Sequence, residues 1–279
     1  MTDRFLIIGG GIRLVKACEA FLSRGYEASV YNGVIPLKTA IDKADIILLG
    51  LPASKDDINI ELDDGKKIPL RDIAALSGGR KIVLGGRFSE KVKALFDIYS
   101  VRWADYAATE EFEILNAVPT AEGAIQIAME EFPFTLHKSR SVVTGFGKVA
   151  KALAFRLKAL GSECSVVARN PSARAEAESF GFKAIDFSNL PYEAKNCHIL
   201  FNTVPAMVIG KNVLGQLKPS QGIIDLASKP GGVDLDSAKT YGVNVVWALS
   251  LPGKVAPLTA GEIICQTACN IACDLRMQN

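Results

Sequence analysis

Ser141-Val-Val-Thr-Gly145-Phe-Gly147-Lys-Val-Ala150 carries the strongest structural signal in this chain. A β-branched apolar run leads into the spacing G-x-G-x-x-A, and an amphipathic helical pattern follows. In this spacing the first glycine permits a tight turn, the second lets the backbone approach a pyrophosphate, and the alanine lets the helix pack close to the strand. The segment predicts the dinucleotide loop of a Rossmann-like domain. The residues expected at the cofactor here are Gly145, Phe146, Gly147, Lys148 and Val149.

Short apolar runs alternate with amphipathic stretches on both sides of this segment, which indicates parallel sheets covered by helices. The second half of the chain predicts strands at 141–144, 164–168, 183–186, 198–202, 222–226 and 243–247. The first half predicts strands at 5–8, 28–31, 46–51, 81–84 and 99–103, with helices near 13–24, 37–43, 70–76 and 89–97. The expected fold class is therefore α/β, with two Rossmann-like domains built on parallel sheets.

Two more helices are expected to join the two domains and to leave a crevice between them. One begins after Pro119-Thr120 and stops at Pro133, and the other opens with Thr259-Ala-Gly-Glu262, a capping-box pattern. The expected domains are an N-terminal substrate domain at 1–118, completed by the helix 259–277, a bridging helix at 119–133, and an NADP-binding domain at 134–258. Ligand sites favour such crevices, outside the carboxyl ends of the strands.

Composition narrows the class of protein. The 279 residues carry a formal net charge of +2 with interspersed signs, which gives no reason to expect nucleic acid or an acidic membrane as a partner. The N-terminus lacks the features of a signal peptide, and no apolar run reaches the roughly 20 residues that cross a bilayer. We expect a cytoplasmic protein.

The six cysteines include no Cys-x-x-Cys pair. Cys265, Cys269 and Cys273 recur every fourth residue, so on a helix they form one stripe, which we interpret as small apolar residues on a packed face. His137 and His198 show no ligand spacing, and no metal site is expected.

The end of the predicted strand 164–168 bears on the choice between NAD and NADP. NAD sites place Asp or Glu about 20 residues beyond the glycine loop, where it binds the ribose 2′-hydroxyl, but no carboxylate stands there in this sequence. The neighbouring donors are suited to a 2′-phosphate, which favours NADP over NAD. These candidate cofactor residues are Arg169, Asn170, Ser172 and Arg174. The alternative is two solvated arginines beside an NAD site.

Three loops after the fourth, fifth and sixth strands of the cofactor domain are rich in Pro, Gly and small polar residues. Their position predicts contact with the nicotinamide end of the cofactor. The candidates in these loops are Asn202, Thr203, Val204, Pro205, Asp225, Leu226 and Pro252 for the cofactor, and Ser228 and Lys229 for a substrate. Lys229 is the cation of the second loop and a candidate partner for a carboxylate.

A second glycine cluster, Gly9-Gly10-Gly11, follows the first strand of the N-terminal half. It is either a second nucleotide loop of poorer spacing or part of a substrate site. Arg13, next to it, is a candidate anchor for a substrate carboxylate, the alternative being a solvated arginine.

Several motifs occur in the order and spacing of one family, the dehydrogenase-like subunit of dipicolinate synthase, which this chain resembles closely over about 110–270 and loosely before that. They are Asn116-Ala-Val-Pro119-Thr120-Ala-Glu122-Gly123-Ala124, His137, Ala168-Arg169, Asn202-Thr-Val-Pro205-Ala-Met207, Asp225-Leu-Ala-Ser228-Lys-Pro230-Gly-Gly232 and Leu251-Pro-Gly253-Lys-Val-Ala-Pro257-Leu-Thr259-Ala-Gly261. The chain departs from the family at Lys148-Val149-Ala150, at Gly11, where Asp is expected, and at Lys229, which replaces an Arg.

The resemblance implies NADP-dependent oxidation of a dihydrodipicolinate, formed from 4-hydroxytetrahydrodipicolinate, to the dipicolinic acid of spores. It also implies a flavoprotein-like second subunit, and proteins of this plan are commonly homodimers or higher homo-oligomers. Arg13 and Lys229 would hold the substrate carboxylates beside Thr120 and Ser228. Glu122 would accept the ring proton or stabilise a helix N-terminus, and Asp225 would orient Lys229.

Two alternative functions remain. The Pro-Gly-x-Val-x-Pro segment is also similar to methylenetetrahydrofolate dehydrogenases, although the first half lacks their Tyr-x-x-x-Lys pair. The chain would then be an NADP-dependent dehydrogenase of a folate or of another small carboxylate. The other alternative is a protein that binds or senses NADP without catalysis.

Overall fold

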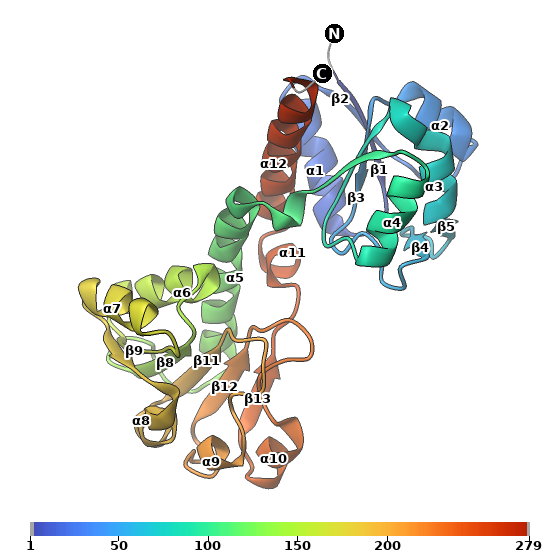
Figure 1. The fold of residues 1–279 in the computed structure, drawn as a ribbon. Coiled ribbons are helices and arrows are strands. Elements are labelled where there is room, and N and C mark those ends of the chain that lie inside the picture. Colours follow the sequence, from blue (N-terminus) through green and yellow to red (C-terminus); the bar gives the residue numbers. More distant parts are fainter. Residues whose placement is uncertain (1–2, 278–279) are drawn as a thin grey trace. The chain divides into compact units, whose positions relative to one another are not determined.

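The computed structural model describes residues 3–277. The chain divides into two compact units, one formed by Met1–Asn116 with Ala256–Asn279 and the other by Ala117–Val255. Each unit is built on its own parallel sheet, so the predicted α/β class with two Rossmann-like domains is confirmed (Figure 1). Within residues 3–277, no helix combines the length and apolar character needed to cross a bilayer.

The sheet of the first unit has five strands in the order β2-β1-β3-β6-β7. The strands are β1 (Arg4–Ile8), β2 (Glu27–Val30), β3 (Ile46–Leu49), β6 (Ile82–Gly85) and β7 (Arg102–Asp105), and every neighbouring pair is parallel. The helices between them are α1 (Ile12–Ser23), α2 (Leu37–Lys43), α3 (Leu70–Ser77) and α4 (Glu90–Ile98). The last strand starts three residues later and ends two residues later than the interval 99–103 that the apolar pattern predicts.

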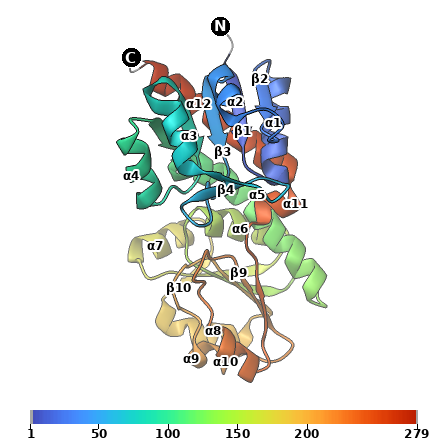
Figure 2. The same ribbon diagram turned by 90° about the vertical axis from the view of Figure 1, so that its right-hand side faces the viewer.

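Alternation along the strands divides the core of this unit into two layers. Phe5 and Ile7 of β1 face α1 and the C-terminal helix α12 (Pro257–Met277), whereas Leu6 and Ile8 face α2, α3 and α4 (Figure 1 and Figure 2). Because both faces of the sheet are buried at its centre, β1, β3 and β6 consist almost entirely of apolar residues. The backbones of α1 and α12 approach so closely that a Cβ on Gly261 would lie 2.5 Å from the carbonyl carbon of Lys16.

A β-hairpin that the sequence analysis did not predict lies between β3 and α3. It consists of β4 (Asn59–Glu61) and β5 (Lys67–Pro69), paired antiparallel (Figure 1). The turn contains Asp64-Gly65, with Gly65 at φ +81°, a dipeptide typical of hairpins. The hairpin strands are only three residues long, too short for the window in which alternation is recognised.

The sheet of the second unit has six strands in the order β10-β9-β8-β11-β12-β13, the arrangement of a dinucleotide-binding domain. The strands are β8 (Arg140–Thr144), β9 (Glu163–Val167), β10 (Lys183–Ile185), β11 (Ile199–Asn202), β12 (Gly222–Asp225) and β13 (Asn244–Trp247). The helices of this sheet are α6 (Lys148–Ala159), α7 (Pro171–Ser179), α8 (Leu190–Asn196), α9 (Lys211–Leu214) and α10 (Leu235–Thr240). All six strands fall within one residue of their predicted bounds, because buried parallel strands leave a clear apolar signature.

The two faces of this sheet are covered by different helices. Val143 and Phe201 pack against α6, α7 and the helix α5 (Glu110–Glu131), whereas Val142 and Leu200 pack against α8, α9 and α10 (Figure 1). The strand order reverses between β8 and β11, and in open α/β sheets ligands bind at such a switch point.

The predicted start of the helix near Pro119 is wrong, because α5 begins at Glu110 and contains Pro119 in its interior. Proline lacks the N–H of a helical hydrogen bond, but the following turns bury Ala121, Ala124 and Ala128 in the core of the second unit. Glu122 therefore lies in the middle of a helix, and its expected role at a helix N-terminus does not apply.

The predicted loop 251–259 is also wrong. It forms the short helix α11 (Leu251–Val255) and the first turn of α12, which starts at Pro257, before the expected capping box. Proline near a helix start removes an N–H that would have no partner there, so both helices tolerate it.

Candidate functional site

The glycine loop after β8 is open where a phosphate would approach it. Gly145 has φ +87°, and a Cβ there would lie 2.6 Å from the Oγ1 of Thr203. Gly147 is the N-cap of α6 at φ −83°, it has no side chain that could cap the helix, and a Cβ at this position would meet nothing within 4 Å. The space beside Gly147 at the start of α6 is therefore open, as the approach of a dinucleotide to a helix N-terminus requires.

The side chains around the glycine loop hold its backbone in place and do not project into the open space beside it. The Phe146 ring is 7% exposed and packs at the edge of Phe182, so Phe146 offers a ligand its backbone alone. Lys148 and Val149 are half-buried in the first turn of α6. The Thr203 hydroxyl donates to the Thr144 carbonyl at 2.7 Å, which keeps the loop after β11 against the glycine loop.

The two arginines beyond β9 have different surroundings. The Nη1 of Arg174 donates to the carbonyls of Ala168 and Arg169, at 2.7 and 2.8 Å, and forms an ion pair with Asp186 at 3.0 Å. Arg174 thus fixes the loop. Arg169 is exposed, and its side chain contacts no acid among residues 3–277. Asn170 caps α7 through the amide of Ser172 at 2.9 Å.

A buried polar network joins the ends of β8, β11 and β12. Thr144 donates to the Oδ1 of Asn202 at 2.6 Å, and the Nδ2 of Asn202 donates to Asp225 at 2.7 Å. The carboxylate of Asp225, 2% exposed, also accepts the amides of Ala227 at 3.0 Å and Gly232 at 2.9 Å. Asn202 and Asp225 therefore shape the following loops from below and do not lie at the surface of the site.

Asp225 and Lys229 are not brought together by a hydrogen bond or an ion pair within residues 3–277. Lys229 is exposed at the tip of the loop that Asp225 anchors, and Ser228 is half-buried beside it. The amide of Leu226 donates to the Asn202 carbonyl at 2.8 Å, which places this loop next to the one after β11. In that second loop Val204 is half-buried and Pro205 is exposed.

The remaining candidates of the second unit lie on the helices α5 and α11. Glu122 accepts the Nε of Arg156 at 3.3 Å, an ion pair between α5 and the last turn of α6. Thr120 is half-buried on the same helix. Pro252 is buried in α11, whose Leu251 packs against α5 at Gly123, where a Cβ would lie 3.2 Å from the Leu251 Cβ.

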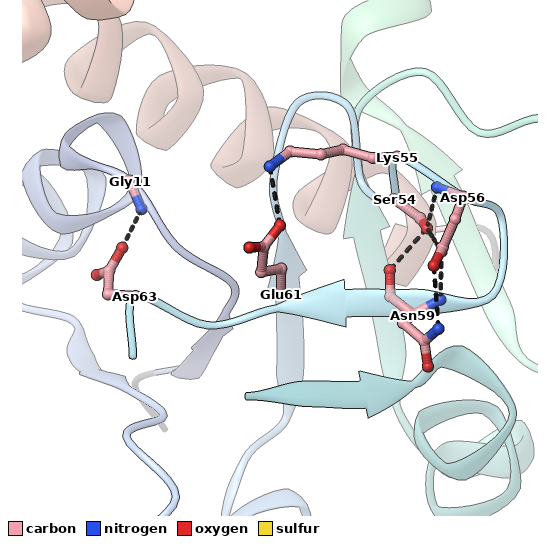
Figure 3. Close-up of polar contacts among 7 residues, drawn as sticks. All are labelled: Gly11, Ser54, Lys55, Asp56, Asn59, Glu61 and Asp63. Atoms are coloured by element: carbon pink, nitrogen blue, oxygen red, sulfur yellow. Dashed lines mark hydrogen bonds and ion pairs between the residues drawn. The ribbon is translucent and has the colours of Figure 1, made fainter. Parts of the chain in front are cut away.

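The glycine loop of the first unit differs from that of the second because an internal carboxylate already occupies it. The amide of Gly11 donates to the Oδ1 of Asp63 at 2.7 Å, as Figure 3 shows, and the amide of Gly10 donates to the Glu61 carbonyl at 3.0 Å. Arg13, in the first turn of α1, is half-buried. Burial is the main cause that lowers the pKa of Arg13, and the positive charge of Arg87 lowers it further.

Asp63, Arg87 and the role of Thr144 are not apparent from the sequence. The Asp64-Gly65 dipeptide was the available signal for the hairpin that carries Asp63. No local pattern pointed to Arg87, because the residue whose charge it affects, Arg13, lies more than seventy residues away in the chain.

Comparison with known proteins identifies the class of the second unit. Residues 118–230 match the family model of the D-isomer specific 2-hydroxyacid dehydrogenase NAD-binding domain. One subunit of the dipicolinate synthase of Bacillus subtilis is 32% identical over 169 residues, which are 61% of this chain and 57% of that relative. The match thus spans little more than half of the relative's length.

Solved structures extend the similarity of the fold to both units. The crystal structure of the corresponding dipicolinate synthase subunit from Bacillus halodurans superposes with a TM-score of 0.87 at 25% identity, over 96% of this chain and 97% of that one. The structure of the Bacillus subtilis subunit gives a TM-score of 0.88 at 24% identity, over 100% and 98%. The predicted resemblance to this dipicolinate synthase subunit is confirmed, and the domain match assigns a nicotinamide dinucleotide as the cofactor.

Proposed function

We propose that this chain, an NAD(P)-dependent oxidoreductase related to the dehydrogenase-like subunit of dipicolinate synthase, oxidises a dihydrodipicolinate to dipicolinate with NADP as its cofactor. The observation that carries the proposal is the open space beside Gly147 at the start of α6, within a domain of the dehydrogenase class. The substrate would derive from 4-hydroxytetrahydrodipicolinate by loss of water.

The choice of NADP rests on the loop after β9. Arg169 is an exposed cation without an acidic partner among residues 3–277, and no carboxylate follows β9 directly to receive a ribose hydroxyl. A guanidinium group binds phosphate through two parallel charge-assisted hydrogen bonds. Arg174 is engaged with two carbonyls and Asp186, so Arg169 is the proposed ligand of the 2′-phosphate and Arg174 holds the loop behind it.

The chemistry asks for positioning more than for a strong base. The cofactor, when bound, accepts a hydride from the dihydropyridine ring, and the ring loses one proton as it becomes aromatic. Aromatisation favours this loss, so the proton can pass to water. The protein would hold the carboxylates of the substrate through Arg13 and Lys229, with Thr120 and Ser228 as further donors. Glu122, already paired with Arg156, is the weaker candidate for a proton acceptor.

The relatives also bear on the partners of this chain, because each of them is one subunit of a synthase. A second subunit is therefore implied, which we propose to be flavoprotein-like, and we propose a homodimer or higher homo-oligomer for this chain. Asp225 would act indirectly, by fixing the loop that carries Lys229.

The decisive experiment supplies 4-hydroxytetrahydrodipicolinate and NADP⁺ to the purified chain, with and without the second subunit. Formation of NADPH together with the absorbance of aromatic dipicolinate is the expected result. If neither appears when the second subunit is present, the proposed reaction is wrong. NADPH binding without turnover of this substrate would instead favour a dehydrogenase of another carboxylate, or a protein that binds NADP without catalysis.

A further inference from the structure

Three loops meet at the carboxyl edge of the first unit's sheet. The loop after β3 and the loop after β6 are joined by two hydrogen bonds, from the amide of Gly86 to the Gly50 carbonyl at 3.0 Å and from the amide of Ala53 to the Gly86 carbonyl at 2.8 Å. The fully buried Tyr106 supports both, because its hydroxyl donates to the Leu49 carbonyl at 3.1 Å. The third loop, at Gly9–Gly11, contacts the loop after β3 at Gly50.

Two amides that would bind a phosphate at this edge, those of Gly10 and Gly11, are already occupied. Asp63 accepts the Gly11 amide, and a Cβ on Gly10 would lie 2.6 Å from the Asp63 carboxylate (Figure 3). A carboxylate at a helix N-terminus takes the place and the charge of a bound phosphate. These two amides are closed to a bound anion, so we expect side chains to contribute to anion recognition at this edge.

Two cations remain at this edge without an acidic partner. Neither Arg13 nor Arg87 forms a side-chain hydrogen bond or an ion pair within residues 3–277, although Arg13 is half-buried. Arg87 follows Gly86, which is hydrogen-bonded to Gly50, and Gly50 lies beside the glycine loop that leads to Arg13, so the two arginines stand on neighbouring loops. Two neighbouring positive charges, one of them partly removed from water, are unfavourable unless an anion binds between or beside them.

The backbone of Arg87 is held in an unusual conformation. Its φ is +56°, a region that residues other than glycine rarely adopt. Asp105 imposes it by accepting the amides of Arg87 at 3.0 Å and Phe88 at 2.9 Å, and it also accepts the Ala107 amide at 2.9 Å. Asp105 thus binds backbone, and the guanidinium of Arg87 is left for a ligand. Strained residues of this kind concentrate at ligand sites.

We propose that Arg87 and Arg13 form a carboxylate-binding subsite at the carboxyl edge of the first unit's sheet, with Arg87 as a specificity-determining residue. Its proposed ligand is a pyridine dicarboxylate, and this choice of ligand rests on the proposed function. The subsite selects a carboxylate over a phosphate because the negative charge of Asp63 already occupies the N-cap amide of α1, at Gly11.

Arg87→Gly separates binding from folding. Glycine adopts a positive φ without strain, so this variant keeps its melting temperature or raises it. A charge-assisted hydrogen bond contributes about 1.5–3 kcal/mol, and its loss weakens the affinity for pyridine-2,6-dicarboxylate by about 10- to 100-fold in calorimetric titration. Arg87→Lys keeps the charge without the planar fork and gives an intermediate affinity. Arg80→Ala, the same loss of charge at another exposed arginine of this unit, leaves the affinity unchanged.

NADPH affinity, measured in parallel, is the same in all four proteins. If Arg87→Gly binds the dicarboxylate as tightly as the parent chain, the subsite is wrong and the proposed function stands. If the parent chain binds NADPH but no dicarboxylate, the proposed function itself fails, and the ligand named here fails with it. Inorganic phosphate that competes with the dicarboxylate at equal affinity, and depends on Arg87, would overturn the selectivity for a carboxylate.

Discussion

Glycines play two roles in the loop after β8: Gly147 leaves space for the cofactor, and Gly145 adopts a backbone conformation that other residues avoid. Replacing Gly147 by alanine tests the first role separately from the second. A Cβ on Gly147 meets nothing within 4 Å, and its φ of −83° is ordinary for any residue, so the methyl group fits the protein. The space that it fills is where a pyrophosphate would approach the amides of α6. Gly145→Ala is the matched control, because its φ is +87° and its methyl group would lie 2.6 Å from the Thr203 hydroxyl.

The magnitudes distinguish the two variants. For Gly147→Ala, alanine is the poorer N-cap by roughly 0.5–1 kcal/mol, and the stiffer unfolded chain offsets about 0.4–1 kcal/mol, so the free energy of unfolding hardly changes. For Gly145→Ala, the left-handed backbone costs about 1–2 kcal/mol, and displacing Thr203 from the Thr144 carbonyl costs about 1 kcal/mol more. We expect a melting temperature about 5–10 °C lower for Gly145→Ala and one essentially unchanged for Gly147→Ala.

NADPH affinity completes the comparison. Losing one charge-assisted hydrogen bond to the pyrophosphate weakens binding by about 10- to 100-fold in Gly147→Ala. The assays are differential scanning fluorimetry without cofactor and a titration of NADPH fluorescence. Unchanged NADPH affinity in Gly147→Ala would refute the placement of the pyrophosphate at α6. A large drop in its melting temperature would refute the claim that the position is open.

Other perturbations test separate parts of the structure. In parallel titrations, Arg169→Ala should weaken NADPH binding by about tenfold or more and leave NADH binding unchanged. Arg174→Ala should weaken the binding of both cofactors, because it releases the loop after β9. A hydrogen bond from its neighbour Cys265 lowers the pKa of Cys269 to about 7, whereas burial raises the pKa of Cys164 to about 12. Iodoacetamide alkylation followed by mass spectrometry should therefore show labelling of Cys269 that rises to a plateau above neutral pH. Cys164 should not be labelled. The hydrogen bond from Arg4 lowers the pKa of Asp45 below its unfolded value. The pair therefore stabilises the fold above about pH 4 and loses this effect as the pH falls through the folded-state pKa. The difference in melting temperature between the parent chain and Asp45→Asn should shrink from pH 7 to pH 3.

The stripe of cysteines shows that a periodic pattern predicts the side of a helix on which residues lie, but not their burial. Spacing of four correctly places Cys265, Cys269 and Cys273 on one side of α12, but their surroundings differ along the helix. Cys265 is buried, Cys269 is half-buried and Cys273 is exposed, so the interpretation as a packed face holds for the first and fails for the last. Burial depends on which element covers each turn, and the pattern does not contain that information.

The segment from β8 to α6 could be predicted from the residues themselves, because its signals are local. The apolar run, the spacing of Gly145 and Gly147, and the helical periodicity after them lie within about twenty residues, and each depends on the geometry of the backbone. The same holds for the strands of both sheets, whose buried faces are recorded in their own composition.

Tertiary structure alone assigned partners to the polar groups. Asp63 caps α1 from fifty-two residues away, Arg174 turns out to hold a loop together, and Asp225 lies beneath the surface of the site where the sequence suggested a side chain on it. A hydrogen bond needs two groups about 3 Å apart, and the folded path of the chain, not the spacing of residues along it, decides which groups come that close.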